Sequence, residues 1–231
     1  MALILSIDTA LEHALTCVGN AETIIAEEQN SEQKNHAAFV QPAIERILEK
    51  NNLSLNDIDA VAVSAGPGSY TGLRVGLASA KGLCFTLNKP LILLNTLKIM
   101  AKAATLQLNN SKALYCPMID ARRMEVFAAL YDFSLSEIVP TGAFVVTEEN
   151  FIHQFCKQNR EIIFFGNGID KWKNIAPAGN FHFYDKNISV GNAINILAQQ
   201  SFERQQFADL GYSEPIYAKG FYTTAKISEQ Q

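Results

Sequence analysis

The strongest chemical signal in the sequence is a glycine-rich segment from Ser64 to Gly76, which reads SAGPGSYTGLRVG. Glycines let backbone amides approach a ligand closely, and the N-terminus of a following helix offers unpaired N–H groups and a partial positive charge. The segment therefore predicts a site for a phosphate or another anion. It has neither the Gly-Lys-Ser/Thr of a Walker loop nor the spacing of a dinucleotide fingerprint. A tight strand-to-helix turn, capped by Ser69 or Thr71, is the alternative interpretation.

A second candidate is the pair Asp8-Thr9, which directly follows the apolar run Leu3 to Ile7. Parallel α/β sheets place their sites at the carboxyl ends of strands, where a carboxylate could hold a metal or a phosphate-bound water. A cap in a strand-end turn is the alternative. Together with the glycine segment, this pair gives the candidate phosphate-binding residues, which are Asp8, Thr9, Gly66, Gly68, Ser69, Thr71 and Gly72.

The residue spacing does not indicate a metal site or a nucleophilic catalytic site. His36 begins a predicted helix, but Val40 stands where a His-x-x-x-His pair would have its second ligand. We therefore predict no metal site and assign no catalytic residue. The four cysteines form no CxxC pair and lie in apolar runs, which predicts buried thiols in a reducing compartment.

The elements that position these residues follow from hydrophobic periodicity and turn signals. Because the first three predicted strands are joined tightly, we expect them to be antiparallel, whereas helical crossovers make the later strands parallel. The sheet is therefore predicted to be mixed. The predicted order is strands 3–8, 13–19 and 22–28, helix 35–51, strand 60–64, helix 71–87, strand 91–94 and a helix with Thr96 as its cap.

The second half of the chain repeats this order, which predicts an internal duplication of a βββαβα unit. Ile7-Asp8 corresponds to Ile119-Asp120, and Gly66-Pro67-Gly68 corresponds to Gly166-Asn167-Gly168. We therefore expect an α/β protein with subdomains 1–106 and 107–212 and a C-terminal tail, 213–231. The second-half elements are strands 113–119, 124–131 and 137–145, helix 147–157, strand 161–165 and helix 191–202.

Composition narrows the functional classes. The 231 residues are 48% hydrophobic and 18% charged, which is typical of a folded globular chain. The net charge is −4, so the chain lacks the basic footprint of a protein that holds nucleic acid alone. The N-terminus has no pattern of a signal peptide, and no apolar run approaches about 20 residues. We expect a cytoplasmic protein.

Two predicted helices carry apolar faces that could bind a partner or the chain's own sheet. The glycines in helix 71–87 would cost about 2 to 3 kcal/mol relative to alanine, so close packing must compensate. One stripe per helix is enough to cover a sheet, and that alternative stays open. The candidate interface residues are Phe39, Val40, Ile44 and Ile47 in the first helix and Leu73, Gly76, Leu77 and Ala80 in the second.

Four segments together resemble the bacterial TsaB (YeaZ) family over essentially the whole chain. They are Ile7-Asp8-Thr9, the glycine segment, Asp120 to Val126 (DARRMEV) and Gly166-Asn167-Gly168. The resemblance implies a duplicated actin/Hsp70-like (ASKHA) ATPase fold with mixed sheets. It also implies a role in forming threonylcarbamoyladenosine at position 37, next to the anticodon, in tRNAs that read codons starting with A.

In that system the homologous subunit TsaD carries the metal and transfers the threonylcarbamoyl group, and TsaE is a third component. The resemblance implies that this chain is a non-catalytic partner that activates TsaD through the two helices, contacts tRNA only through TsaD, and forms a homodimer when alone. A nucleotide at the interface with TsaD is left open.

Two departures from the family pattern affect particular sites. The family commonly ends near Pro-x-Tyr-Leu-Arg, whereas this chain has Pro215-Ile216-Tyr217-Ala218-Lys219. Asp8 and Asp120 are not followed by the glycines usual in actin-like phosphate loops, which argues against tight ATP binding by this chain. The rival functions are a stand-alone ATPase or small-molecule kinase and a metallopeptidase.

Overall fold

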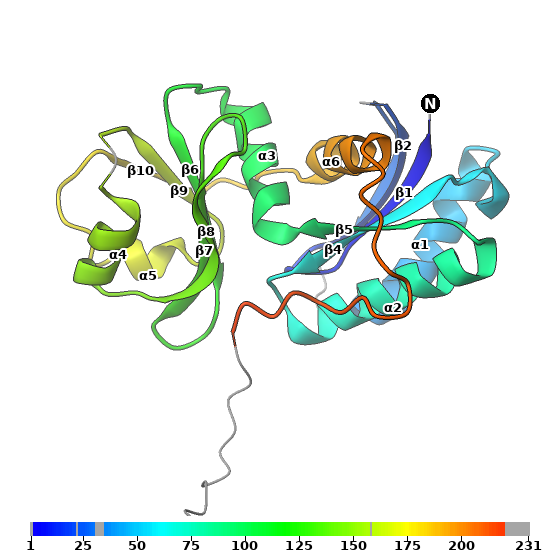
Figure 1. The fold of residues 1–231 in the computed structure, drawn as a ribbon, viewed down its shortest axis with the longest axis horizontal. Helices are drawn as coiled ribbons and strands as arrows, with labels where there is room; N and C mark the ends of the chain where they lie inside the picture. Colours follow the sequence, from blue (N-terminus) through cyan, green and yellow to red (C-terminus); the bar gives the residue numbers. More distant parts are fainter. Residues whose placement is uncertain (1, 22, 31–34, 158, 220–231) are drawn as a thin grey trace, which may run out of the picture.

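Two five-stranded mixed sheets, each flanked by helices, form the two lobes of the protein (Figure 1). The structure is a computed structural model that describes residues 2–21, 23–30, 35–157 and 159–219. None of the helices in these ranges is long and apolar enough to cross a membrane.

The first sheet has the strand order β3-β2-β1-β4-β5. β1 pairs antiparallel with β2 and parallel with β4, and its Ile4, Leu5 and Ile7 side chains are fully buried. β2 and β3 are antiparallel and β4 and β5 are parallel, so the predicted mixed sheet is confirmed. The strands are β1 (Leu3–Asp8), β2 (Ala14–Asn20), β3 (Thr23–Asn30), β4 (Ala60–Gly66) and β5 (Leu91–Asn95).

The second sheet repeats this topology in the order β10-β9-β6-β7-β8. β6 takes the place of β1, because it pairs antiparallel with β7 and parallel with β9. The predicted duplication is therefore confirmed. β10 takes the place of β5, and the sequence pattern missed this strand. The strands are β6 (Leu114–Asp120), β7 (Glu125–Tyr131), β8 (Glu137–Val145), β9 (Ile162–Phe165) and β10 (Phe181–Tyr184).

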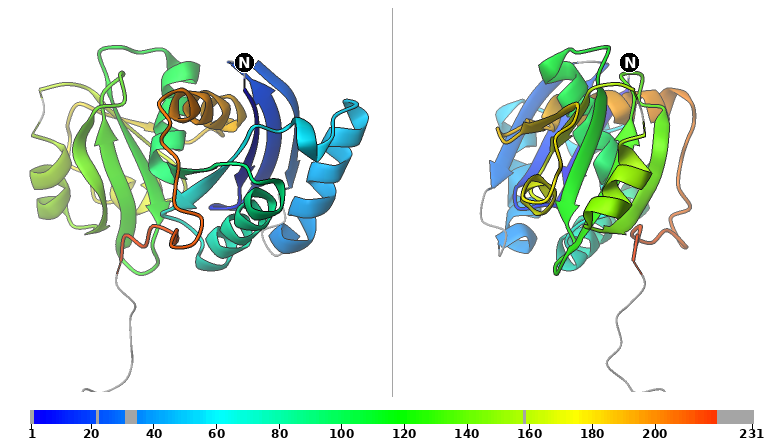
Figure 2. Two further views of the ribbon diagram at one scale, coloured as in Figure 1. Left: turned by 45° about the vertical axis from the view of Figure 1, so that its right-hand side comes forward. Right: turned by 90° about the vertical axis from the view of Figure 1, so that its left-hand side faces the viewer.

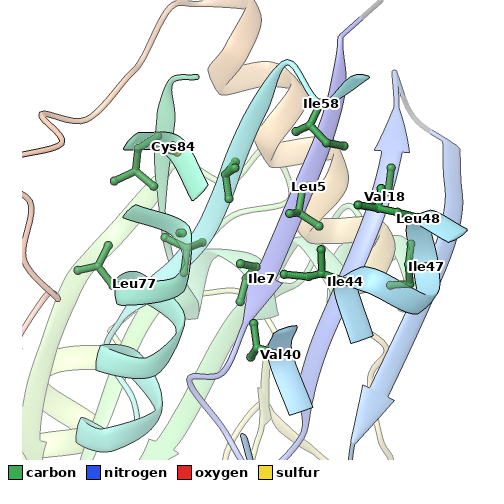
Figure 3. Packing of buried hydrophobic residues seen from close by; sticks show 14 residues of the cluster. Leu5, Ile7, Val18, Val40, Ile44, Ile47, Leu48, Ile58, Leu77 and Cys84 are labelled. Carbon is green, nitrogen blue, oxygen red and sulfur yellow. The ribbon is translucent and has the colours of Figure 1, made fainter. Parts of the chain in front are cut away.

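Helices α1 and α2 cover one face of the first sheet, and α6 covers the other (Figures 1 and 2). The close view in Figure 3 shows the apolar side chains between α1, α2 and the strands. The second lobe contains α4, which corresponds to the predicted helix 147–157. It also contains the short α5, which the sequence pattern did not predict. The helices are α1 (His36–Lys50), α2 (Tyr70–Leu87), α3 (Thr96–Leu108), α4 (Glu148–Phe155), α5 (Ile169–Lys173) and α6 (Gly191–Glu203), with a 3-10 turn η2 (Leu55–Asp57).

The last helix of each repeat joins the two lobes. One face of α3 packs with the first sheet through Ile99 and Ala103, and its other face packs with the second sheet through Leu97 and Met100. The predicted subdomain 107–212 included α6. In the structure α6 instead packs on the first sheet, since its apolar stripe is buried among residues of β1, β2, β4 and β5.

Local details correct two further predictions. Asn95, and not Thr96, caps α3, because the Asn95 side chain accepts a hydrogen bond from the Lys98 amide at 3.1 Å. Three cysteines are buried as predicted, but Cys156 is only half-buried. Burial raises the pKa of Cys17 to about 12, which keeps that thiol protonated and unreactive.

Two glycines of α2 should respond oppositely to alanine. A Cβ at Gly76 would collide with the Thr9 hydroxyl, whereas a Cβ at Gly82 would meet no atom within 4 Å in the part of the chain that the structure describes. We expect Gly76→Ala to lower the free energy of unfolding by about 1 to 3 kcal/mol and Gly82→Ala to raise it by about 0.5 to 1 kcal/mol. Urea unfolding of both variants measures this, and equal shifts would contradict the packing described.

Candidate functional site: the interlobe cleft and the outer face of α2

The glycine segment is packed directly against the hairpin that follows β1. The Ser69 amide donates to the Ala10 carbonyl at 2.7 Å, and the Thr9 hydroxyl donates to the Gly72 carbonyl at 2.7 Å. A Cβ at Gly68 or Gly72 would collide with the backbone of this hairpin. The glycines therefore allow one piece of backbone to lie against another.

Ser69 also caps α2, since its hydroxyl accepts a hydrogen bond from the Gly72 amide at 3.3 Å. The structure thus brings Asp8-Thr9 together with the 68–72 part of the glycine segment, whereas Gly66 lies against Ile216 and Leu73. Several polar groups of the assembled residues bond to one another. The capped strand-to-helix turn, given above as the alternative, describes this geometry. The Ala10 carbonyl is the partner that the sequence pattern missed, because backbone acceptors carry no residue signature.

Asp8 lies at the centre of this packing and is only 3% exposed. Its Oδ1 accepts hydrogen bonds from the Ser64 hydroxyl at 2.6 Å and from the Ala10 amide at 3.0 Å. Burial raises the pKa of Asp8, and these two hydrogen bonds, followed by the charge of His36, offset part of the rise. The carboxylate is therefore a sealed structural group of the first hairpin.

The corresponding aspartate of the second lobe, Asp120, lies in a more open environment. Its Oδ1 accepts from the Arg122 amide at 2.6 Å and forms an ion pair with Lys171 Nζ at 2.8 Å. Partial burial alone would raise the pKa of Asp120, but Lys171 and the Arg122 amide hold it below its usual value. Sequence reasoning missed Lys171, because it lies on the unpredicted helix α5.

The two hairpins line a cleft of about 710 Å³ between the lobes. Among the described residues that line it, the cation is Arg122 and the acids are Glu12 and Asp120. Arg122 sits in the left-handed backbone region with φ of +64°. A cavity of about 500 Å³ adjoins the cleft and includes Glu12, His13 and Asn167 in its lining. The described lining of the interlobe cleft therefore has little positive charge with which to bind a polyphosphate.

The predicted interface residues of α1 and α2 point into the chain's own core. Figure 3 shows Val40, Ile44, Ile47 and Leu77 directed toward the first sheet. This corrects the prediction, because a side chain that fills the core offers no surface to a partner. Phe39 is partly buried, and the other seven residues of the set are buried: Val40, Ile44, Ile47, Leu73, Gly76, Leu77 and Ala80.

Part of the surface that α2 leaves exposed carries no charge, and the exposed Arg74 lies at its border. We define the outer face of α2 as Thr71, Ala78, Gly82, Phe85 and Thr86, all of which are exposed, with Phe85 81% exposed. The charged side chains of α2 lie to one side, where Arg74 and Lys81 contact the C-terminal segment. A groove of about 460 Å³ lies between α1 and the Leu83 side of α2.

These features define a class. The duplicated sheets and the paired hairpins facing one cleft are those of the actin/Hsp70-like ATPase fold. A solved structure from Pseudomonas aeruginosa, described as similar to peptidase YEAZ, superposes with a TM-score of 0.82 at 19% identity and covers 95% of this chain and 100% of its own. An activator of 2-hydroxyisocaproyl-CoA dehydratase from Clostridium difficile with bound ADPNP has a TM-score of 0.51 at 9% identity, covering 89% and 96% of the two chains.

Sequence comparison places the chain within this class. The family model of TsaD, tRNA N6-adenosine threonylcarbamoyltransferase, matches residues 23–215. The Escherichia coli protein named tRNA threonylcarbamoyladenosine biosynthesis protein TsaB is 30% identical over 97% of both chains. The Haemophilus influenzae protein of that name is 31% identical over 84% of both chains. The chain therefore belongs to the TsaB (YeaZ) family, which confirms the resemblance.

The burial of Asp8 predicts a specific pH dependence. Because its folded pKa is raised, the folded state favours protonated Asp8, and ionisation destabilises the fold at pH values above that pKa. We expect the stability of Asp8→Asn relative to the wild type to be highest at pH 7.5 and to fall as the pH is lowered to 4.5. If the amide side chain changes the free energy of unfolding by an amount that does not depend on pH, the expected difference between pH 7.5 and 4.5 is unaffected.

Urea unfolding at both pH values checks the Asp8 prediction. Asp57→Asn is a matched control, because hydrogen bonds from the Ser54 amide and hydroxyl lower the pKa of Asp57 and it titrates below this window. Its stability relative to the wild type should not change between pH 7.5 and 4.5. A flat response for Asp8→Asn as well would contradict the sealed environment.

Proposed function

We propose that this chain is a non-catalytic subunit of threonylcarbamoyladenosine formation at position 37 of tRNA, which binds and activates TsaD. The observation that carries the proposal is the 30% identity, over 97% of both chains, to a protein named for this pathway. The transfer reaction would reside in TsaD, TsaE would be the third component, and tRNA would be contacted through TsaD. The protein would act in the cytoplasm.

The environment of His36 supports the non-catalytic role. Its Nε2 lies 3.2 Å from the Glu12 carbonyl oxygen, within hydrogen-bonding distance, so the ring contacts the chain's own hairpin. Val40, one helical turn later, is fully buried in the core and offers no ligand atom. Within the described ranges no group of three His, Cys, Asp or Glu side chains is arranged to hold a metal.

The cleft supports the proposal that this chain binds no nucleotide tightly. The Ser69 amide and the Thr9 hydroxyl bond within the chain, and two acids accompany Arg122 in the cleft lining. Phosphate-binding sites depend on free amides and an excess of positive charge. A nucleotide held between this chain and TsaD is compatible with these contacts.

The outer face of α2 supports a helical contact with the partner. A helix face that stays in water usually carries charged side chains, but this one has small residues and the exposed Phe85. Among the described residues, no neighbour of Gly82 requires a glycine. A glycine inside a helix costs about 1 kcal/mol relative to alanine, and the packing of these residues does not account for that cost. A partner helix approaching the backbone there would account for it. The same face would serve a homodimer when TsaD is absent.

A glutamate at Gly82 should separate folding from association. We expect Gly82→Glu to weaken binding to the TsaD of the same organism at least tenfold, because it places a charge and a side chain in the contact. The isolated chain should be as stable as the wild type or more stable, since a helical glycine is removed. Size-exclusion chromatography and calorimetric titration measure binding, and urea unfolding measures stability.

The control for the Gly82 variant is Ile152→Glu, which adds the same charge to the exposed side of α4 in the other lobe. This variant should bind TsaD like the wild type. If Gly82→Glu binds with unchanged affinity, the outer face of α2 is not the contact surface. That result would not decide the pathway role, which the reconstitution below tests separately.

Reconstitution tests the pathway role directly. Purified TsaD, TsaE, ATP, threonylcarbamoyl-adenylate and tRNA are combined with and without this chain, and the modified nucleoside is measured by mass spectrometry. We expect modification to depend on the chain. Equal modification in its absence would overturn the proposed function.

The rival function, a stand-alone ATPase or kinase, makes an opposite prediction for the isolated chain. Titration with Mg²⁺ and ATP should give no binding in the micromolar range, because the cleft lacks the required positive charge. Micromolar affinity with turnover would favour the rival. Metal analysis of the purified protein tests the metallopeptidase reading, and we expect no stoichiometric metal.

A further inference from the structure

Two sequence motifs without a role in the proposed function meet in the structure. One is Pro215 to Lys219 in the C-terminal segment, and the other is the DARRMEV segment of the second lobe. Lys219 Nζ and Glu125 Oε2 form an ion pair at 2.5 Å, with side chains that are 34% and 23% exposed. Because Glu125 begins β7, this pair ties the end of the described chain to the second lobe.

The same C-terminal segment is anchored to the first lobe before it reaches Glu125. The Ala208 amide donates to the Leu91 carbonyl at 2.8 Å, which adds a bridge to β5. Farther along, Lys81 Nζ donates to the carbonyls of Gly211 at 3.3 Å and Ser213 at 3.1 Å. These contacts fasten the segment along the side of α2, as Figure 1 shows.

The segment then crosses the glycine loop that ends β4. The Ile216 amide donates to the Ala65 carbonyl at 2.7 Å. Gly66 has a φ of +122°, and a Cβ there would lie 2.6 Å from the Ile216 carbonyl oxygen. The crossing is therefore close enough to require glycine at this position.

Aromatic and cationic side chains hold the crossing from the other side. Arg74 Nε donates to the Tyr217 hydroxyl at 3.2 Å, and the Arg74 guanidinium lies 4.0 Å from the centre of the Tyr70 ring. The Tyr70 and Tyr217 rings are 5.7 Å apart. Tyr70 also lines the interlobe cleft, so the segment borders that cleft.

We propose that residues 208–219 are an intramolecular clamp that fixes the two lobes relative to each other. Helices α3 and α6 lie between the lobes on one side, and the clamp runs between them on the other (Figures 1 and 2). The clamp borders the interlobe cleft where Tyr217 contacts Tyr70. Rotation of the lobes about α3 requires the Lys219–Glu125 pair to break. The clamp thereby limits opening of the cleft, and this conclusion does not depend on the proposed partner or pathway.

Charge reversal at the Lys219–Glu125 pair tests the clamp. Hydrogen exchange, followed by mass spectrometry, reports opening of peptides 65–72 and 120–127, which line the cleft. Since partly exposed ion pairs contribute modestly, Lys219→Glu and Glu125→Lys should each speed exchange there by about two- to fivefold. The double swap should restore the wild-type rate, because the pair is rebuilt with its charges exchanged.

Lys112→Glu is the control, since it makes the same charge change at an exposed second-lobe lysine away from the clamp. It should leave exchange at the cleft unchanged. Single variants that exchange like the wild type, or a double swap that stays fast, would overturn the proposal.

A stop codon after Glu214 removes the crossing and the ion pair together. We expect this chain to melt cooperatively, to exchange at least tenfold faster in the cleft peptides and to have a larger radius of gyration by X-ray scattering. A folded truncated chain with wild-type exchange would overturn the clamp. If the truncated chain does not fold, the charge-swap series decides alone.

Discussion

The close approach of the first hairpin to the start of α2 is the constraint on which the rest of the structure depends. Thr9 and Ala10 lie with their backbone against Gly68 and Gly72, and the Ser69 amide and Thr9 hydroxyl complete the contact. This approach sets the position of α2 on the sheet. It also seals Asp8 from water and keeps the outer face of α2 turned away from the core.

The internal duplication shows how one topology supports two different environments. Asp8 and Asp120 end equivalent strands, but Asp8 is 3% exposed and bonded to Ser64, whereas Asp120 pairs with Lys171 of the short α5. Burial therefore raises one pKa, and a neighbouring cation lowers the other. The two aspartates therefore relate differently to the interlobe cleft, because Asp120 is among the described residues that line it and Asp8 is buried behind the first hairpin.

Periodicity predicted the strands, the mixed sheets and the repeat, because these depend on local patterns along the chain. The short elements β10 and α5 escaped prediction. β9 is equally short but is a run of four buried apolar residues, whereas β10 (FHFY) and α5 (IDKWK) mix polar and apolar residues without a clear period. The pairing of Asp8 with Ser64 and of Glu125 with Lys219 could not be predicted either, because these partners are distant in the sequence. The glycines predicted a close approach correctly, but spacing alone does not say whether a ligand or the chain's own backbone makes it.

The circumference of α2 shows how these constraints combine. Its buried side faces the first sheet, and Arg74 and Lys81 fasten a second side to the C-terminal segment. The remaining side is the uncharged outer face, where a Cβ at Gly82 would meet no atom of the described residues within 4 Å. Because a helix held on two sides cannot rotate to hide the third, the position of that exposed face is fixed by the fold. A partner bound there would contact a helix that the C-terminal segment also ties to the second lobe, so the contact surface and the interlobe geometry share one rigid element.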